Sequence, residues 1–137
     1  MGAITQAIYD RLVGDATLAG LLSTYGGNPA VFTTDPAPGD ADLPYVVTAG
    51  AVSVAPFDTK TTLGRQVVRD VRCYAAAEGS AVTVEAIAER VRWLFHRRTL
   101  TVAGFSWIWA ECSGPIGADE PDAYGRIVTV SMTIEES

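Results

Sequence analysis

The sequence holds little of the chemistry on which small metalloproteins and thiol enzymes depend. Its 137 residues include one histidine and two cysteines, Cys73 and Cys112. These cysteines lie far apart, without the close spacing of a paired zinc-binding motif. We therefore expect no metal site and no cofactor, and we interpret both cysteines as small, buried, apolar side chains.

Long apolar runs are also missing. No stretch approaches the ~20 residues that a bilayer-spanning helix needs. The N-terminal MGAITQAIYD lacks the basic region and apolar core of a secretion signal. The sequence thus predicts a protein with no membrane partner that stays in the cytoplasm where it is made.

Positive charge is scarce. Ten lysines and arginines stand against sixteen acids, for a net charge of -6, and Lys60 is the sole lysine. A freely exposed nucleic-acid-binding protein usually has the opposite balance. An acidic balance is instead compatible with a surface past which DNA slides without adhering. It does not exclude a local patch of arginines.

No group of residues forms a recognisable catalytic motif. His96 is the only side chain whose ordinary pKa lies near neutrality, but it sits at a predicted helix end beside two arginines and has no G-x-S-x-G partner. The acids cluster in loops without the spacing of a calcium loop, and no glycine-rich segment leads into a Lys-Ser/Thr helix. We therefore predict that the protein is not an enzyme.

Composition and periodicity indicate one α+β domain over residues 1–137. Hydrophobic residues make up 48% and charged residues 19% of the chain. Ile4, Ile8 and Leu12 predict a helix that ends near Gly14. Asp15 can cap a second short helix, for which Gly26-Gly27 is the expected end.

The best predicted helix follows Gly79. Ser80 or Thr83 is its expected cap, and His96 to Arg98 close it, where positive charge complements the helix dipole. Its predicted buried stripe consists of Val84, Ile87, Ala88, Val91, Leu94 and Phe95.

Strand patterns predict a mostly antiparallel sheet with helices packed on one face. The last strand alternates almost perfectly, with Val128, Val130, Met132 and Ile134 on its inner face. The acidic segment 113–125 and residues 35–44 are predicted as loops, and Ala103-Gly104 as a hairpin turn. The predicted strands are Val31–Thr33, Tyr45–Val54 (weakened or bulged at Gly50), Gln66–Ala76, Leu100–Val102, Phe105–Cys112 and Arg126–Glu135.

Two features are candidates for partner contacts. Trp107 and Trp109 share a face with Phe105, and the opposite face is also apolar, which favours helices on one side and a neighbouring copy on the other. The alternative is an aromatic platform for bases or sugars. Phe57, Lys60 and Leu63 lie in the Ala55–Gly64 segment, which is either a protruding loop that inserts into a partner or a connection without function.

Three segments together resemble the tail-terminator family (tail-completion, head–tail joining) of long-tailed bacteriophages and gene transfer agents. They are AIYDRLVGDATLAGLL, APGDADLPYVV and VVRDVRCYAAAEGSAVTVEAIAERVRWLFHRRTLTVAG. The resemblance covers about residues 4–112. The long acidic loop at Ala118–Tyr124 departs from the commonest family pattern.

The resemblance implies a structural virion protein, assembled in the cytoplasm of a host bacterium. Its copies would form a ring, expected to be a hexamer, that caps the head-proximal end of the tail tube. The implied partners are the tail tube protein and the head–tail connector or stopper protein, with DNA only passing through the channel. We expect Asp119, Glu120 and Asp122 to face that channel.

Alternative functions remain open at this point. One alternative is another neck or tail component, such as a stopper or a tube subunit, and tube subunits share an antiparallel sheet with a long β-loop. A small enzyme or ligand-binding domain with a pocket under Trp107 and Trp109 is disfavoured because no nucleophile and base can be named.

Overall fold

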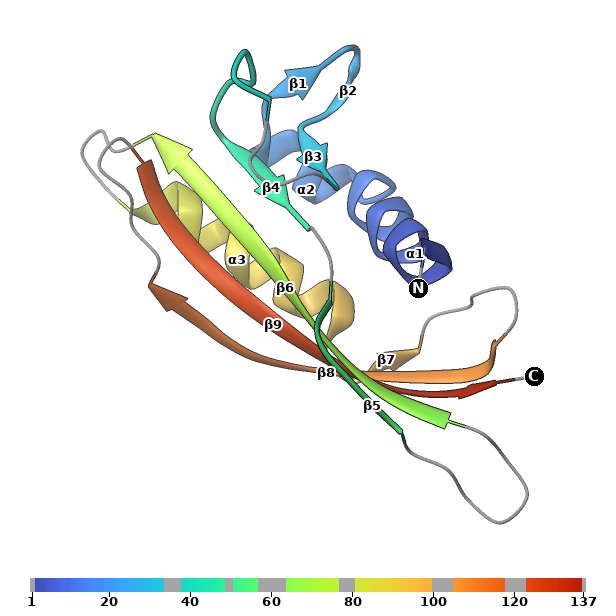
Figure 1. The fold of residues 1–137 in the computed structure, drawn as a ribbon. Coiled ribbons are helices and arrows are strands. Elements are labelled where there is room, and N and C mark those ends of the chain that lie inside the picture. Colours follow the sequence, from blue (N-terminus) through green and yellow to red (C-terminus); the bar gives the residue numbers. More distant parts are fainter. Residues whose placement is uncertain are drawn as a thin grey trace.

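Helices cover one face of a long, twisted sheet, and none of the described helices lies on the opposite face (Figure 1). The computed structural model describes residues 2–33, 38–48, 51–56, 64–76, 81–99, 105–117 and 123–136. The helices are α1 (Gly2–Val13), α2 (Ala16–Leu21) and α3 (Val82–Phe95). The strands are β1 (Thr24–Tyr25), β2 (Asn28–Pro29), β3 (Val31–Phe32), β4 (Tyr45–Val47), β5 (Ala51–Pro56), β6 (Gly64–Ala76), β7 (Arg98–Thr99), β8 (Phe105–Gly117) and β9 (Ala123–Glu136).

The sheet has the order β3-β4-β6-β9-β8-β7, and β5 also pairs with β6. Only the β3–β4 pair is parallel among the described pairs. The last strand, β9, lies between the two other long strands, with Val71 opposite Val128 and Ala110 opposite Met132. The α+β class and the mostly antiparallel sheet are thus confirmed.

The two N-terminal helices are found as predicted, except for the end of α2. Ile4, Ile8 and Leu12 are fully buried, and Asp15 caps α2 by accepting a hydrogen bond from the Leu18 amide at 2.9 Å. The predicted end at Gly26-Gly27 is wrong, because α2 ends at Leu21. With φ of 60° and 85°, the two glycines instead form the tight turn between β1 and β2.

The predicted strand 45–54 is two strands. β4 pairs with the end of β6, and β5 pairs with its beginning across a register shift between Ala51 and Ser53. The break falls next to Gly50, where weakening was expected, although residues 49–50 lie outside the described residues.

The predicted loop 113–125 is mostly strand. β8 continues to Gly117 and β9 begins at Ala123. Gly114 has a φ of 86° and lies within a register shift between Ser113 and Ile116, so this turn-like composition forms a β-bulge. The predicted strand at 100–102 and the hairpin turn after it lie outside the described residues, and β7 at Arg98–Thr99 pairs with β8.

The stripe predicted for α3 is confirmed at all six positions. The predicted Thr83 cap is wrong, because the helix already begins at Val82, after Ala81, which makes no side-chain cap bond. Ser80 lies outside the described residues. Glu85 in the first turn supplies the negative charge that this helix end favours.

One hydrophobic core joins the helices to the inner face of the sheet. It includes the predicted inner residues of β9, all fully buried. The inner face of β6 also holds Arg69, only 1% exposed, whose Nη1 donates to Thr5 Oγ1 at 2.8 Å. No described helix is long and apolar enough to cross a membrane.

The outer face of the sheet is polar at its centre and apolar at one end. The described outward side chains at the centre of β6 and β9 are mostly half-buried and polar, such as Asp70, Thr129, Ser131 and Thr133. The outward residues Val47, Tyr74 and Ala123 instead form a second, smaller buried cluster. The expectation that both faces of the Phe105–Cys112 strand are apolar stays a prediction on its outer face, where the described side chains are the half-buried Trp109 and the exposed Glu111.

Candidate functional site

The histidine and cysteine side chains, which are of the types that often act in catalysis, make structural contacts. His96 ends α3, and its Nδ1 accepts a hydrogen bond from the Cys112 amide at 3.0 Å. Burial raises the pKa of the Cys73 thiol to about 12 and that of Cys112 to about 11, the latter opposed by Arg92. Both thiols are therefore protonated near neutral pH and are poor nucleophiles.

Acidic and metal-ligating side chains do not converge in the part of the chain that the structure describes. Within the described ranges, no group of three or more histidine, cysteine or acidic residues is placed to hold a metal ion. The described surface instead offers features suited to contact with other macromolecules.

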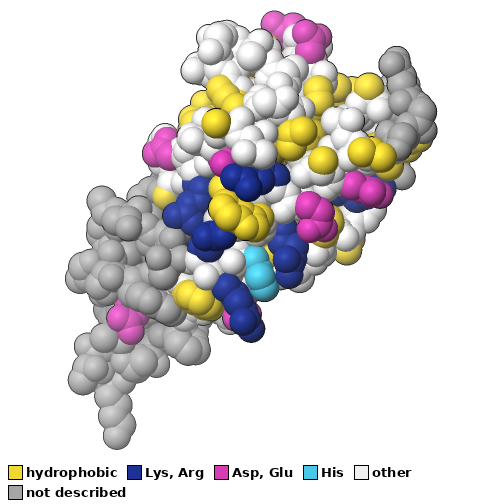
Figure 2. Space-filling view, turned by 180° about the vertical axis from the view of Figure 1, so that it is seen from behind, with side chains coloured by type: hydrophobic (Ala, Val, Ile, Leu, Met, Phe, Trp, Pro, Cys, Tyr) yellow, Lys and Arg dark blue, Asp and Glu magenta, His cyan; other side chains and the backbone are white. Residues whose placement is uncertain are grey.

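The first such feature is a basic aromatic patch at the C-terminal end of α3. We call Arg11, Arg90, Trp93, Arg97 and Arg98 the Trp93 patch. Trp93 is 51% exposed because it lies opposite the buried stripe of the helix. The guanidinium carbons of Arg90 and Arg98 lie 4.1 Å and 3.9 Å from its ring centroid. Figure 2 shows arginine side chains gathered around exposed hydrophobic atoms on this side of the molecule.

The patch is fixed by hydrogen bonds from three elements. Arg98 Nε donates to the Trp93 carbonyl at 2.6 Å, and Arg11 Nη1, from α1, donates to the Leu94 carbonyl at 3.1 Å. Arg90 binds the cap residue Asp15 through two hydrogen bonds of 2.8 Å and 2.7 Å. Beside Trp93, a shallow hollow of about 400 Å³ is lined by Arg11, Trp93, Leu94, Arg97 and Arg98.

Charges within the patch influence one another. Burial, and then the nearby charge of Arg98, lower the pKa of Arg11. The hydrogen bonds from Arg90 lower the pKa of Asp15. Arg90 is paired with the carboxylate of Asp15, and the four arginines together favour the binding of anions.

The second feature is the uncovered sheet face, formed by the outward side chains of β6, β8 and β9. It presents Trp109, Asp70, Glu111 and Glu135 among serine and threonine residues, together with Arg72. Thr129 Oγ1 donates to Asp70 at 3.0 Å, and Trp109 Nε1 donates to Glu111 at 3.4 Å. Figure 1 shows α3 on the far side of these strands.

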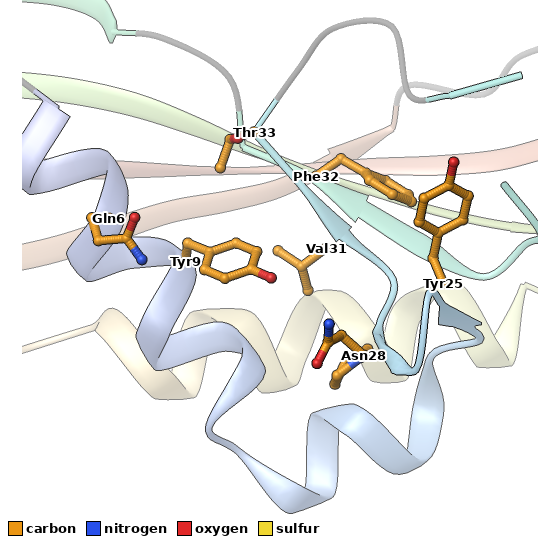
Figure 3. A pocket seen from close by; sticks show the side chains of 8 residues that line it. Gln6, Tyr9, Tyr25, Asn28, Val31, Phe32 and Thr33 are labelled. Atoms are coloured by element: carbon orange, nitrogen blue, oxygen red, sulfur yellow. The ribbon is translucent and has the colours of Figure 1, made fainter.

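The third feature is a hollow of about 400 Å³ between α1 and strands β2 and β3. Figure 3 shows Gln6 and Tyr9 projecting from α1 toward Val31, and Tyr25 beside Phe32. The hydroxyl of Tyr25 donates to Asp40 at 2.9 Å. Neither this hollow nor the one beside Trp93 is lined by Trp109. Neither hollow is therefore the ligand pocket that the sequence analysis considered beneath Trp107 and Trp109.

The structure places only some of the predicted contact residues. Trp109 is half-buried on the outer face, and Trp107 is a residue of β8 opposite Glu135, its side chain being outside the description. The remaining candidates, Phe57, Lys60, Leu63, Asp119, Glu120 and Asp122, lie outside the described residues.

The Trp93 patch was missed by the sequence analysis. Its visible sign was RVRWLFHRR, in which four arginines and a tryptophan fall within residues 90–98 and Trp93 stands off the apolar stripe. Arg11 could not be assigned to it, because the packing of α1 against α3 cannot be predicted from the spacing of residues within either helix.

Comparisons with known proteins give one consistent answer. The family model for tail completion protein gp17 matches residues 6–135. A solved chain from the virion of a native gene transfer agent particle superposes with a TM-score of 0.75 and 27% identity, over 99% of this chain and 96% of that one. A second solved chain, at 11% identity and a TM-score of 0.61 over the same shares, has the same fold. No curated protein matches the sequence.

Proposed function

Because this chain belongs to the tail completion protein gp17 family, we propose that its copies form a ring that caps the head-proximal end of a tail tube. The chain is a structural protein of a phage-type tail or neck, not an enzyme. In the proposed role, the ring ends tube polymerisation, joins the tail to the head or neck, and leaves a channel for DNA. Six copies are the proposed stoichiometry.

One observation carries this proposal. The similarity to a chain of a gene transfer agent virion extends over 99% of this protein, at 27% identity. It therefore includes the long sheet, the helical layer and the N-terminal helices, and not an isolated motif.

The architecture supports assembly. A ring built by head-to-tail contacts needs two different, complementary surfaces on each copy. We propose that the uncovered sheet face, with Trp109 on it, is one of these surfaces and that Trp107 belongs to the same contact. We further propose that Phe57, Lys60 and Leu63 contact the tail tube protein, and that the connector or stopper protein binds the opposite end of the ring.

The channel lining is a separate proposal. Asp119, Glu120 and Asp122 give the segment before β9 three negative charges in four residues. Placed at the channel, they would repel DNA phosphates and let the duplex pass. A variant with Asn, Gln and Asn at these positions should retain ring formation and bind duplex DNA more tightly at low salt. Unchanged DNA affinity in rings of the variant would remove this assignment.

Electron microscopy of negatively stained samples tests the main proposal. The purified protein is mixed with the tail tube protein produced beside it, and images are scored for rings, free tubes and capped tubes. We expect rings of one size and tubes that stop growing once capped. Growth of the isolated chain into long tubes would identify a tube subunit instead. Persistent monomers without any effect on tube growth would refute the ring.

A further inference from the structure

We propose that the Trp93 patch is a docking surface for a second copy of this chain, and that it binds the acidic, uncovered sheet face of that copy. This inference rests on the proposed ring and names its subunit contact. The contact would pair Arg97 and Arg98 with Asp70 and Glu111 and would seat the Trp93 ring against the neighbouring strands.

The positions of the two surfaces fit a repeating contact. The buried stripe of α3 packs on the inner face of the sheet, so Trp93 points away from the sheet on the helix side. Asp70 and Glu111 lie on the opposite, outer side of the same sheet. Figures 1 and 2 view the molecule from these two sides. Surfaces on opposite sides of one subunit can meet head to tail from copy to copy.

Charge complementarity selects the occupant. The patch gathers four of the ten basic residues, and the rest of the chain therefore holds six basic residues against sixteen acids. The outer face contributes Asp70, Glu111 and Glu135 against Arg72. Two copies, each with a net charge of -6, repel each other on average. Contact between a positive surface of one copy and a negative surface of the other therefore favours one relative orientation.

The residue types suit a protein partner. Tryptophan and arginine are the side chains most enriched among residues that dominate protein–protein binding. Here the guanidinium groups of Arg90 and Arg98 lie against the Trp93 ring, and Arg98 donates a hydrogen bond to the Trp93 carbonyl. Because these long side chains are already ordered, binding them loses little conformational entropy.

Sedimentation velocity across a range of protein concentrations tests the contact, for the chain alone and with tail tube protein. Arg97→Glu and Trp93→Ala should each weaken self-association about tenfold. Glu111→Arg should weaken it similarly from the other side. An equal mixture of Arg97→Glu and Glu111→Arg should associate again, because alternating copies restore opposite charges at every contact.

Arg126→Glu is the matched control. Arg126 pairs with Glu85 in the first turn of α3, at 3.4 Å, so the control changes the net charge equally at the other end of the same helix. It should associate like the wild type. Circular dichroism and thermal unfolding establish that every variant is folded.

Different results would refute the proposed contact and the proposed ring. If Arg97→Glu and Trp93→Ala form rings as the wild type does, the patch is not the contact, and the proposed function stands. If the wild type never associates, alone or with tube protein, both fail. If the Arg97→Glu variant loses binding to a duplex DNA probe while its self-association is unchanged, the patch binds nucleic acid and the proposal is overturned.

Discussion

At residue 15, one carboxylate connects two helices of the helical layer. Asp15 caps α2 through the Leu18 amide and holds Arg90 of α3 in a two-bond ion pair. The side chains of Arg90 and Asp15 are only 24% and 14% exposed, which limits solvent screening. Since Arg90 also stacks on Trp93, this carboxylate positions a member of the Trp93 patch.

Replacing Asp15 should show both roles. Asp15→Ala should lower the free energy of unfolding by about 1–2 kcal/mol, because a cap is lost and Arg90 loses its partner. Asp15→Asn should cost less, since asparagine caps helices about as well as aspartate. Urea denaturation measures both. Asp10→Asn, at an exposed carboxylate bonded to Gln6, is the control and should have little effect.

The same carboxylate predicts a pH dependence. Because Arg90 lowers the folded-state pKa of Asp15, the carboxylate binds a proton more weakly in the folded than in the unfolded protein. Its contribution to stability is therefore present above about pH 4, the unfolded value, and is lost as pH falls through the lower folded pKa. Asp15→Asn should reduce the acid-induced fall in stability between pH 5 and 3, measured by urea denaturation. An identical pH profile in the variant would contradict this.

The sequence predicted the helix cap made by Asp15 but not its ion pair with Arg90. An aspartate before a helical segment indicates a cap, because the cap is made by neighbouring residues. The ion pair joins residues 75 positions apart, and no periodicity records that distance. The same reason hid the place of Arg11 in the Trp93 patch, because its contact with Leu94 joins residues 83 positions apart.

At the scale of the element, α3 is the part that its sequence specifies most completely. Its six predicted stripe residues are the six that the structure buries. Ile87→Ala should lower the free energy of unfolding by about 2–5 kcal/mol, because it opens a cavity in the shared core. Glu89→Ala, on the exposed side of the same helix, should change it little. Urea denaturation of the two variants provides the comparison.

The bulge in β8 depends on a single glycine. Gly114 has a φ of 86°, and a Cβ there would lie 2.8 Å from the Ile127 carbonyl oxygen of β9. Gly114→Ala should therefore destabilise the protein by about 1–3 kcal/mol. Gly117→Ala, in the same strand, meets nothing within 4 Å and should be nearly neutral. Thermal unfolding monitored by circular dichroism distinguishes the two.

This bulge also explains why the sequence misled. Gly114, Pro115 and Gly117 have the composition of a turn, and acids follow them. Pairing with β9 nevertheless continues past them, from Ser113 opposite Thr129 to Ile116 opposite Ile127. Tertiary pairing overrode local turn preference, since a bulge absorbs one irregular stretch without ending the strand.

At the scale of the whole molecule, one core connects both ends of the described chain. Ile4 of α1 and Ile134 of β9 belong to the same cluster of buried residues. We therefore expect one cooperative unfolding transition, with equal calorimetric and van't Hoff enthalpies. Differential scanning calorimetry measures both. Two resolved transitions would show that the N-terminal helices form an independent unit.

Alternation and periodicity foretold the class of the fold but not its arrangement. They predicted an antiparallel sheet with helices on one face, and the inner residues of β9 were predicted correctly. They could not say that β9 lies between β6 and β8, because strand order is set by packing between distant segments.

The central place of β9 has a consequence during synthesis of the chain. On a ribosome, residues 123–136 emerge after every other described element, yet β6 and β8 both pair with them. The nascent polypeptide thus cannot complete its sheet until this segment leaves the exit tunnel. The outer face that spans β6, β9 and β8 therefore forms only once this segment is inserted between the other two strands.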